Sequence, residues 1–202
     1  WSYWPPQKNH WLTTLFRRVH DQEYARLSTQ TAAPNGSSAE RAYSEFALSL
    51  LTESAADSAK TKRHLTAAIR ECESLQEQDP ANPEWKELLA EAYLRLAKVY
   101  HEEQMITGRA GQLVRRQQSK DKTRHYLTKA RELYQQLYEE KTSLRYQAKL
   151  LDLMLRQSLH GGYDDAVSDL TAAQGISRQL ESDLANDLRG LVKASRSLRP
   201  LE

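Results

Sequence analysis

The stretch from Pro83 to about residue 104 carries an apolar pattern that constrains the fold more than any other feature of the sequence. Its apolar side chains recur three, four and seven residues apart, so they lie on one face of an α-helix. The stripe is wide, which is typical of a helix with neighbours on more than one side. It is formed by Trp85, Leu88, Leu89, Ala92, Tyr93, Leu96, Ala97 and Tyr100.

Helical spacing recurs along most of the chain, between short segments that break helices. Only 7 Gly and 6 Pro occur in 202 residues, and the abundant Ala, Leu, Glu, Gln, Arg and Lys favour helix. The expected breaks are Pro34-Asn35-Gly36, Pro80, Pro83 and Gly161-Gly162. We therefore predict an all-α chain of eight helices joined mostly by short turns. The fifth helix is expected to end near residue 140. The last three are expected to span residues 144–159, 163–181 and 183–198.

Three of the expected helices carry detailed predictions. The first should cover residues 8–29, and the second should begin at a capping box formed by Ser37 and Glu40. The second helix is expected to bury Tyr43, Phe46, Ala47, Leu50 and Leu51. The third, over 58–78, is expected to bury Leu65, Ala68, Ile69, Cys72 and Leu75.

The segment 105–120 loses the helical pattern and contains Gly108 and Gly111, so we expect an irregular basic connection or a frayed helix start. Cations gather there and just beyond it, and they could contact phosphate or an anionic lipid surface. The candidates are Arg109, Arg115, Arg116, Lys120, Lys122 and Arg124. A solvated basic connection is the alternative, because stacking aromatic residues are few. The chain's net charge of +2 gives no global basic footprint, so nucleic acid is not an expected partner.

The sequence shows no arrangement typical of catalysis or of a bound metal or cofactor. The single cysteine, Cys72, rules out an intramolecular disulfide and is expected to pack as a small buried thiol. No glycine-rich phosphate loop or nucleophile elbow occurs. The histidines lack metal-ligand spacing and are expected on the surface: His10, His20, His64, His101, His125 and His160. We therefore predict that the chain is not an enzyme and has no cofactor.

Three segments repeat the spacing of a small residue followed by apolar or small residues four and seven positions later. They are Ala68, Cys72 and Leu75, then Ala130, Tyr134 and Leu137, then Ala166, Leu170 and Ala173. This spacing resembles the second helix of a tetratricopeptide repeat, over about Phe46 to Ala194. The step from Ala130 to Ala166 is 36 residues, near the repeat's length of about 34, but the step from Ala68 to Ala130 is 62. The resemblance is therefore to a degenerate array.

The resemblance implies antiparallel helical hairpins stacked as a short right-handed α-solenoid, with an irregular helical bundle as the alternative. It also implies a non-enzymatic scaffold that binds a protein or peptide on the face formed by the first helices. The residues expected to contact this partner are Lys86, Arg95, Lys149 and Arg156. One alternative is a self-associating sensory or regulatory domain. The other is binding of nucleic acid or an anionic surface through residues 109–129.

The first eleven residues, WSYWPPQKNHW, contain three of the four tryptophans. Such aromatics are enriched at the membrane-water boundary beside transmembrane helices. We therefore expect a membrane anchor upstream of Trp1, and a soluble domain on the periplasmic side of a bacterial membrane protein. An aromatic strap on the first helices and a cytoplasmic location are the alternatives. We expect residues 1–7 to form an arm and 8–200 a single helical domain, with 201–202 a cloning remnant.

Overall fold

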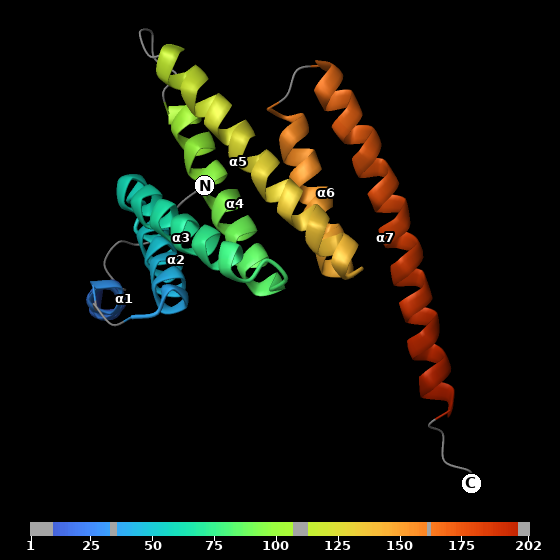
Figure 1. The fold of residues 1–202 in the computed structure, drawn as a ribbon, viewed down its shortest axis with the longest axis horizontal. Coiled ribbons are helices and arrows are strands. Elements are labelled where there is room, and N and C mark those ends of the chain that lie inside the picture. Colours follow the sequence, from blue (N-terminus) through green and yellow to red (C-terminus); the bar gives the residue numbers. More distant parts are fainter. Residues whose placement is uncertain (1–9, 33–35, 107–112, 161–162, 198–202) are drawn as a thin grey trace. The chain divides into compact units, whose positions relative to one another are not determined.

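A computed structural model describes residues 10–32, 36–106, 113–160 and 163–197 of the chain. Every regular element in this part of the chain is an α-helix, which confirms the predicted fold class (Figure 1). The helices are α1 (His10–Ala32), α2 (Ser38–Ser54), α3 (Ser58–Gln78), α4 (Pro83–Ile106), α5 (Leu113–Glu140), α6 (Leu144–Ser158) and α7 (Tyr163–Ser197). None of these described helices combines the length and the apolar character needed to cross a lipid bilayer.

The helices form two compact units, which divide after Ala81. Unit 1 contains α1 to α3 and unit 2 contains α4 to α7. Within each unit, every helix packs on the next one along the chain. Packing between sequential neighbours is common to helical repeats and to antiparallel bundles. The solenoid and the single domain over 8–200 therefore stay predictions.

Local side-chain chemistry explains where several helices begin. The predicted capping box is confirmed: Glu40 N donates to Ser37 Oγ at 3.1 Å, and Ser37 N donates to the Glu40 carboxylate at 2.8 Å. Asp57 caps α3 by accepting from the backbone N–H of Lys60 at 3.0 Å. Pro83 is the first residue of α4, where its missing N–H removes no helical hydrogen bond.

The buried face of α2 differs from the expected one. Tyr43 and Leu50 are exposed, whereas Phe46, Ala47 and Leu51 are half-buried. The buried residues are Ala42, Ser44, Leu48, Ser49 and Thr52. Small hydroxyl side chains can occupy this interface because Ser49 and Thr52 donate to carbonyls of the preceding turn. An apolar pattern does not reveal such a face.

The interfaces of α3 and α5 follow most of the apolar pattern in the sequence, although Leu75 and Tyr126 are half-buried. On α3, the expected residues Leu65, Ala68, Ile69 and Cys72 are buried, and Leu75 is half-buried. In unit 2, the fully buried Ala92 and Ala130 allow α4 and α5 to approach closely. Around them pack Leu89, Tyr93, Leu96, Leu127, Leu133, Tyr134 and Leu137. This apolar interface is the main core of unit 2.

The chain contains one long helix where two were predicted. Residues 163–181 and 183–198 were expected as separate helices, but α7 runs from Tyr163 to Ser197 without a break. No proline lies in this range, and Gly175 stays helical with open space where a Cβ would be. Helix α5 begins at Leu113, so the expected irregular connection is helical from 113 to 120. Residues 105–106 of that connection form the end of α4. Residues 107–112 and Gly161-Gly162 lie outside the described residues.

Candidate functional site

Helices α4 and α6 meet through charged side chains, including two of the four residues predicted to bind a partner. Glu91 of α4 accepts a hydrogen bond from Lys149 Nζ of α6 at 3.0 Å. The same carboxylate lies 3.3 Å from Arg95 Nε and accepts from the hydroxyl of Tyr134 at 3.3 Å. The structure therefore brings Arg95 and Lys149 together on one carboxylate of the same unit.

The other two predicted contact residues lie apart from that cluster. Lys86 was expected to be exposed, but it is only 6% exposed and pairs with Glu140, the last residue of α5. The prediction was wrong because a lysine can bury its methylene stem while its ammonium group reaches a carboxylate. Arg156 pairs with Asp152 on its own helix at 2.8 Å.

The tyrosines of this face strengthen its internal bonding. Burial, and after it the charges of Glu91 and Glu87, raise the pKa of Tyr134 above its usual range. Burial and the Glu87 carboxylate likewise raise the pKa of Tyr146, whose hydroxyl donates to Glu87 at 3.4 Å. Both phenols stay protonated at neutral pH and donate to carboxylates. The α4–α6 face therefore joins α4, α5 and α6 of unit 2 through hydrogen bonds and ion pairs to Glu87 and Glu91.

Helix α5 distributes the predicted anion-binding residues around its surface. Arg116, Lys120 and Arg124 recur every four residues and share one side of the helix. Lys122 lies on the opposite side, with its ammonium group 4.9 Å from the centre of the Tyr100 ring. Arg109 and the side chain of Arg115 fall outside the described part of the chain. Three of the four described cations of this cluster thus share a side of α5, and Lys122 lies apart from them.

A polar cleft of about 440 Å³ lies where α5, α6 and α7 meet. Arg131 donates to Asp169 at 2.7 Å and to Gln157 at 2.9 Å, and Gln157 donates to Thr128 at 3.1 Å. The lining is completed by Arg124, Glu132, Gln135 and Ser168. The lining contains two arginines and two carboxylates, and Arg131 is paired with Asp169, so the cleft has no excess of positive charge that would favour an anion.

An apolar groove of about 590 Å³ lies between α6 and α7. Its lining residues are Leu151, Leu155, Val167, Leu170, Thr171, Ala173, Gln174 and Ser177. Leu155, Val167 and Leu170 are 44%, 47% and 48% exposed. In the repeat pattern Leu170 and Ala173 belong to the same set of spaced small and apolar residues, but of these two only Ala173 is buried. A cluster of half-exposed aliphatic side chains is typical of a surface that binds another protein.

Helix α7 presents further apolar side chains beyond this groove. Gln147, in the first turn of α6, donates to Asp183 at 2.9 Å, and α7 continues from there to Ser197. Leu184 and Leu188 are 45% and 61% exposed in this continuation. We call these two leucines the α7 ridge.

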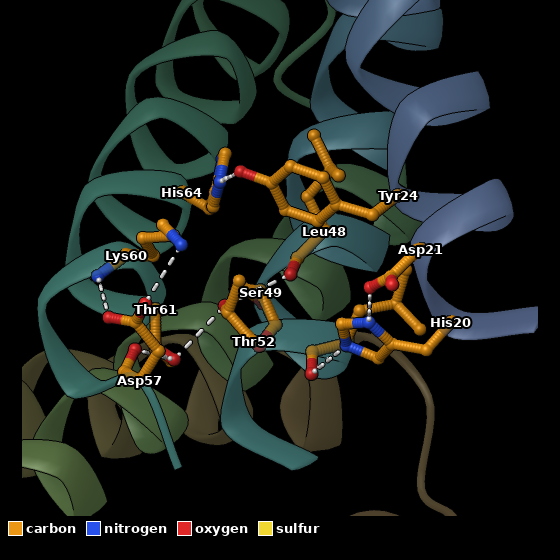
Figure 2. Close-up of polar contacts among 11 residues, drawn as sticks. His20, Asp21, Tyr24, Leu48, Ser49, Thr52, Asp57, Lys60, Thr61 and His64 are labelled. Carbon is orange, nitrogen blue, oxygen red and sulfur yellow. Dashed lines mark hydrogen bonds and ion pairs between the residues drawn. The ribbon is translucent and has the colours of Figure 1, made fainter. Parts of the chain in front are cut away.

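Unit 1 contains a buried histidine that the sequence placed on the surface. His64 of α3 accepts from the hydroxyl of Tyr24 of α1 through Nε2 at 3.1 Å, and its Nδ1 lies 2.7 Å from the Glu45 carboxylate of α2. Figure 2 shows Tyr24 pointing at this ring, beside the hydrogen-bonded Thr52 and Thr61. Its position in the sequence indicated burial, because His64 precedes the buried Ala68 by one helical turn and so lies on the same face of α3.

His160 is the second histidine that the sequence wrongly placed on the surface. Its ring meets that of His101 edge to face, with centroids 4.9 Å apart. Burial, and then the nearby His101 and Lys120, lower the pKa of His160. The Nδ1 atom of His101 has no hydrogen-bond partner among the described residues. The two rings are therefore held together by packing.

The Cys72 thiol is buried and engaged in packing. Burial, and then Glu71 and Glu73, raise the pKa of the Cys72 thiol to about 12. The thiol is therefore protonated and weakly nucleophilic at neutral pH. In the part of the chain that the structure describes, no group of three or more His, Cys, Asp and Glu residues could hold a metal ion.

A scan against protein-family models finds no match to the chain, and searches of curated proteins and of solved structures find no significant similarity. The resemblance to tetratricopeptide repeats thus rests on residue spacing. The candidate site rests on geometry, and its most distinctive feature is the apolar groove with the adjoining α7 ridge.

Proposed function

We propose that this chain is a non-enzymatic interaction module, and that the apolar groove between α6 and α7 binds an amphipathic helix of a partner. The supporting observation is the cluster of aliphatic side chains that two helices present at about half exposure. A helix that lays its apolar face into such a groove uses anchors at positions i, i+3 or i+4, and i+7.

The size of the exposed apolar surface supports a specific contact. Covering the exposed halves of Leu155, Val167 and Leu170 would contribute about 1 kcal/mol each. Three such contributions correspond to roughly a hundredfold in affinity. The polar residues Gln174 and Ser177 at one end of the groove can orient the bound helix.

This proposal keeps the scaffold role that the repeat resemblance implies but moves the binding surface. On the charged α4–α6 face, Lys149 and Arg95 already interact with Glu91, so a partner would have to displace bonds that hold unit 2 together. None of the residues that line the groove is charged. Binding there therefore carries no cost of broken ion pairs.

Selection from a peptide library tests the proposal. The full chain is immobilised at low density, so that neighbouring copies do not compete for the groove, and a phage library of helical peptides is selected on it. We expect enriched peptides with apolar residues at helical spacing. They should bind at least about tenfold more weakly to the Leu155→Glu/Leu170→Glu variant.

The matched control is Val19→Glu/Leu50→Glu, which adds the same charge at exposed apolar positions of unit 1. Peptide binding to this control should equal binding to the unmodified chain, and circular dichroism should show equal helicity for all three proteins. Absence of enrichment, or peptides that bind the groove variant undiminished, overturns the proposal.

A further inference from the structure

One stripe of α7 repeats at alternating steps of three and four residues. Its members are Val167, Leu170, Gln174, Ser177, Glu181, Leu184 and Leu188. Six are exposed and Ser177 is half-buried. This is the heptad spacing of a helix that packs along another helix over several turns. Helix α6 does not cover the stripe, so it faces outward along α7.

The two ends of this stripe have opposite shapes. The first half, with Val167 and Leu170, lies beside α6 and forms one wall of the apolar groove. The second half runs past α6, and from Asp183 to Ser197 α7 extends roughly 20 Å further. Figure 1 shows this continuation of α7 beyond the end of α6. The stripe is therefore hollowed at one end and projects as the α7 ridge at the other.

A surface with a groove at one end and a ridge at the other is complementary to a second copy of itself. An isologous dimer needs this kind of pairing about a twofold axis. With antiparallel helices and the axis near residue 179, Leu188 lies level with Leu170 of the partner subunit. In the same arrangement, Leu184 lies level with Gln174 of the partner subunit, so each ridge enters the other copy's groove.

Charge also favours the antiparallel arrangement. Arg178 and Glu181 are exposed, and neither has an ion-pair partner among the described residues. About the same axis, Ser177 lies level with Glu181 of the partner subunit, which places Arg178 beside that carboxylate. The twofold axis creates this opposite-charge pair twice. Parallel helices would instead place two Glu181 carboxylates together in the seam.

We infer that the chain forms a twofold-symmetric dimer in which the α7 ridge of each copy occupies the apolar groove of the other. The inference rests on the proposed function, because it identifies the amphipathic helix in the groove as α7 of a second copy.

Two double variants test the reciprocal contact. Leu155→Glu/Leu170→Glu damages the groove and spares the ridge, whereas Leu184→Glu/Leu188→Glu damages the ridge and spares the groove. Light scattering should give twice the 23.2 kDa chain mass for the unmodified protein at high micromolar concentration, and the chain mass for each variant. An equimolar mixture of the variants should form heterodimers, because one intact groove and one intact ridge remain.

Charge reversal tests the position of the axis. Arg178→Glu and Glu181→Arg should each raise the dissociation constant of the dimer about tenfold, because each places like charges together twice. The double variant Arg178→Glu/Glu181→Arg should recover the original constant. If the double variant is as weak as the single variants, the antiparallel register is wrong.

Several results overturn the inference. The first is an unmodified protein that is monomeric, and the second is a dimer that persists in both the groove variant and the ridge variant. The third is a dimer that is lost when residues 1–11 are removed, which would assign association to the tryptophan-rich segment. A monomer that still selects groove-binding peptides contradicts the dimer and leaves the proposed function standing. A monomer that selects none contradicts both.

Discussion

Units 1 and 2 both have buried apolar side chains between their helices, but unit 1 adds a network of buried polar groups. In unit 1, hydroxyl groups and an imidazole lie between the helices, as in the Tyr24–His64–Glu45 chain and the 3.0 Å bond from Thr61 to Thr52. In unit 2, α4 and α5 meet through alanines, leucines and tyrosines. Polar interfaces depend on every partner being present, whereas apolar ones depend on volume.

Two surfaces of unit 2, the α4–α6 face and the groove with the α7 ridge, also differ in chemistry. Charged side chains on the α4–α6 face are paired inside the unit, as with Lys149 and Glu91. The aliphatic side chains of the groove and the α7 ridge are left about half exposed by the described residues. The difference teaches that the charges of the α4–α6 face stabilise unit 2 internally, and that the exposed leucines mark the surface available to a partner.

The largest effect is expected from removing a buried aromatic ring of unit 2. Tyr134→Ala should lower the free energy of unfolding by about 4 kcal/mol, because a fully buried ring leaves a cavity between α4 and α5. Tyr134→Phe loses only the bond to Glu91 and should cost about 1 kcal/mol. Urea unfolding followed by circular dichroism measures both values. Equal losses would show that the hydrogen bond, rather than volume, stabilises unit 2.

A smaller loss, governed by partners instead of volume, is expected in unit 1. His64→Leu should cost about 2 kcal/mol, because the Tyr24 hydroxyl and the Glu45 carboxylate lose their shared partner. Adding Tyr24→Phe and Glu45→Gln removes the orphaned hydroxyl and the orphaned charge, so stability should rise again relative to His64→Leu alone. Chemical denaturation of the variants checks this order. A further decrease in the triple variant would mean that His64 contributes by packing alone.

The smallest effect is a pH dependence in unit 2. The pKa of His160 is lowered from 6.5 in the folded chain, so the unfolded chain binds protons at a higher pH than the folded one. Stability contributed by the neutral ring is therefore complete above about pH 6.5 and is lost as the pH falls through the lowered folded pKa.

The urea midpoint of unfolding should be lower at about pH 5.5 than at about pH 7.5, and this difference should be smaller in the His160→Gln variant. An unchanged difference in that variant would assign the pH dependence to other groups.

The sequence predicted several features that depend on residues of one helix, and it missed others that depend on contacts between helices. The capping box of Ser37 and Glu40 and the buried Cys72 follow from spacing within one helix, and both were predicted. The unbroken α7 was not, because Gly175 is tolerated in a helix and nothing near residue 182 stops one. His64 was missed because its partners come from two other helices, 40 and 19 residues away.

The groove could not be predicted from the apolar pattern for a related reason. Leu170 has the spacing of a core residue, and whether it is covered depends on the neighbouring helices and their lengths. Helix α6 has 15 residues and α7 has 35, so α6 leaves much of the α7 surface open. The α7 ridge is exposed by the same difference in length.

Disulfide trapping tests most directly whether this exposed surface is where two copies meet. About a twofold axis near residue 179, position 188 lies level with position 170 of the other copy, while equal positions lie roughly 27 Å apart. An equimolar mixture of the Leu170→Cys and Leu188→Cys variants should therefore form a mixed disulfide dimer under mild oxidation. Neither variant alone should do so, since Cys72 is buried with a pKa of about 12. No cross-link in the mixture, or equal cross-linking of each variant alone, would contradict the paired groove and ridge.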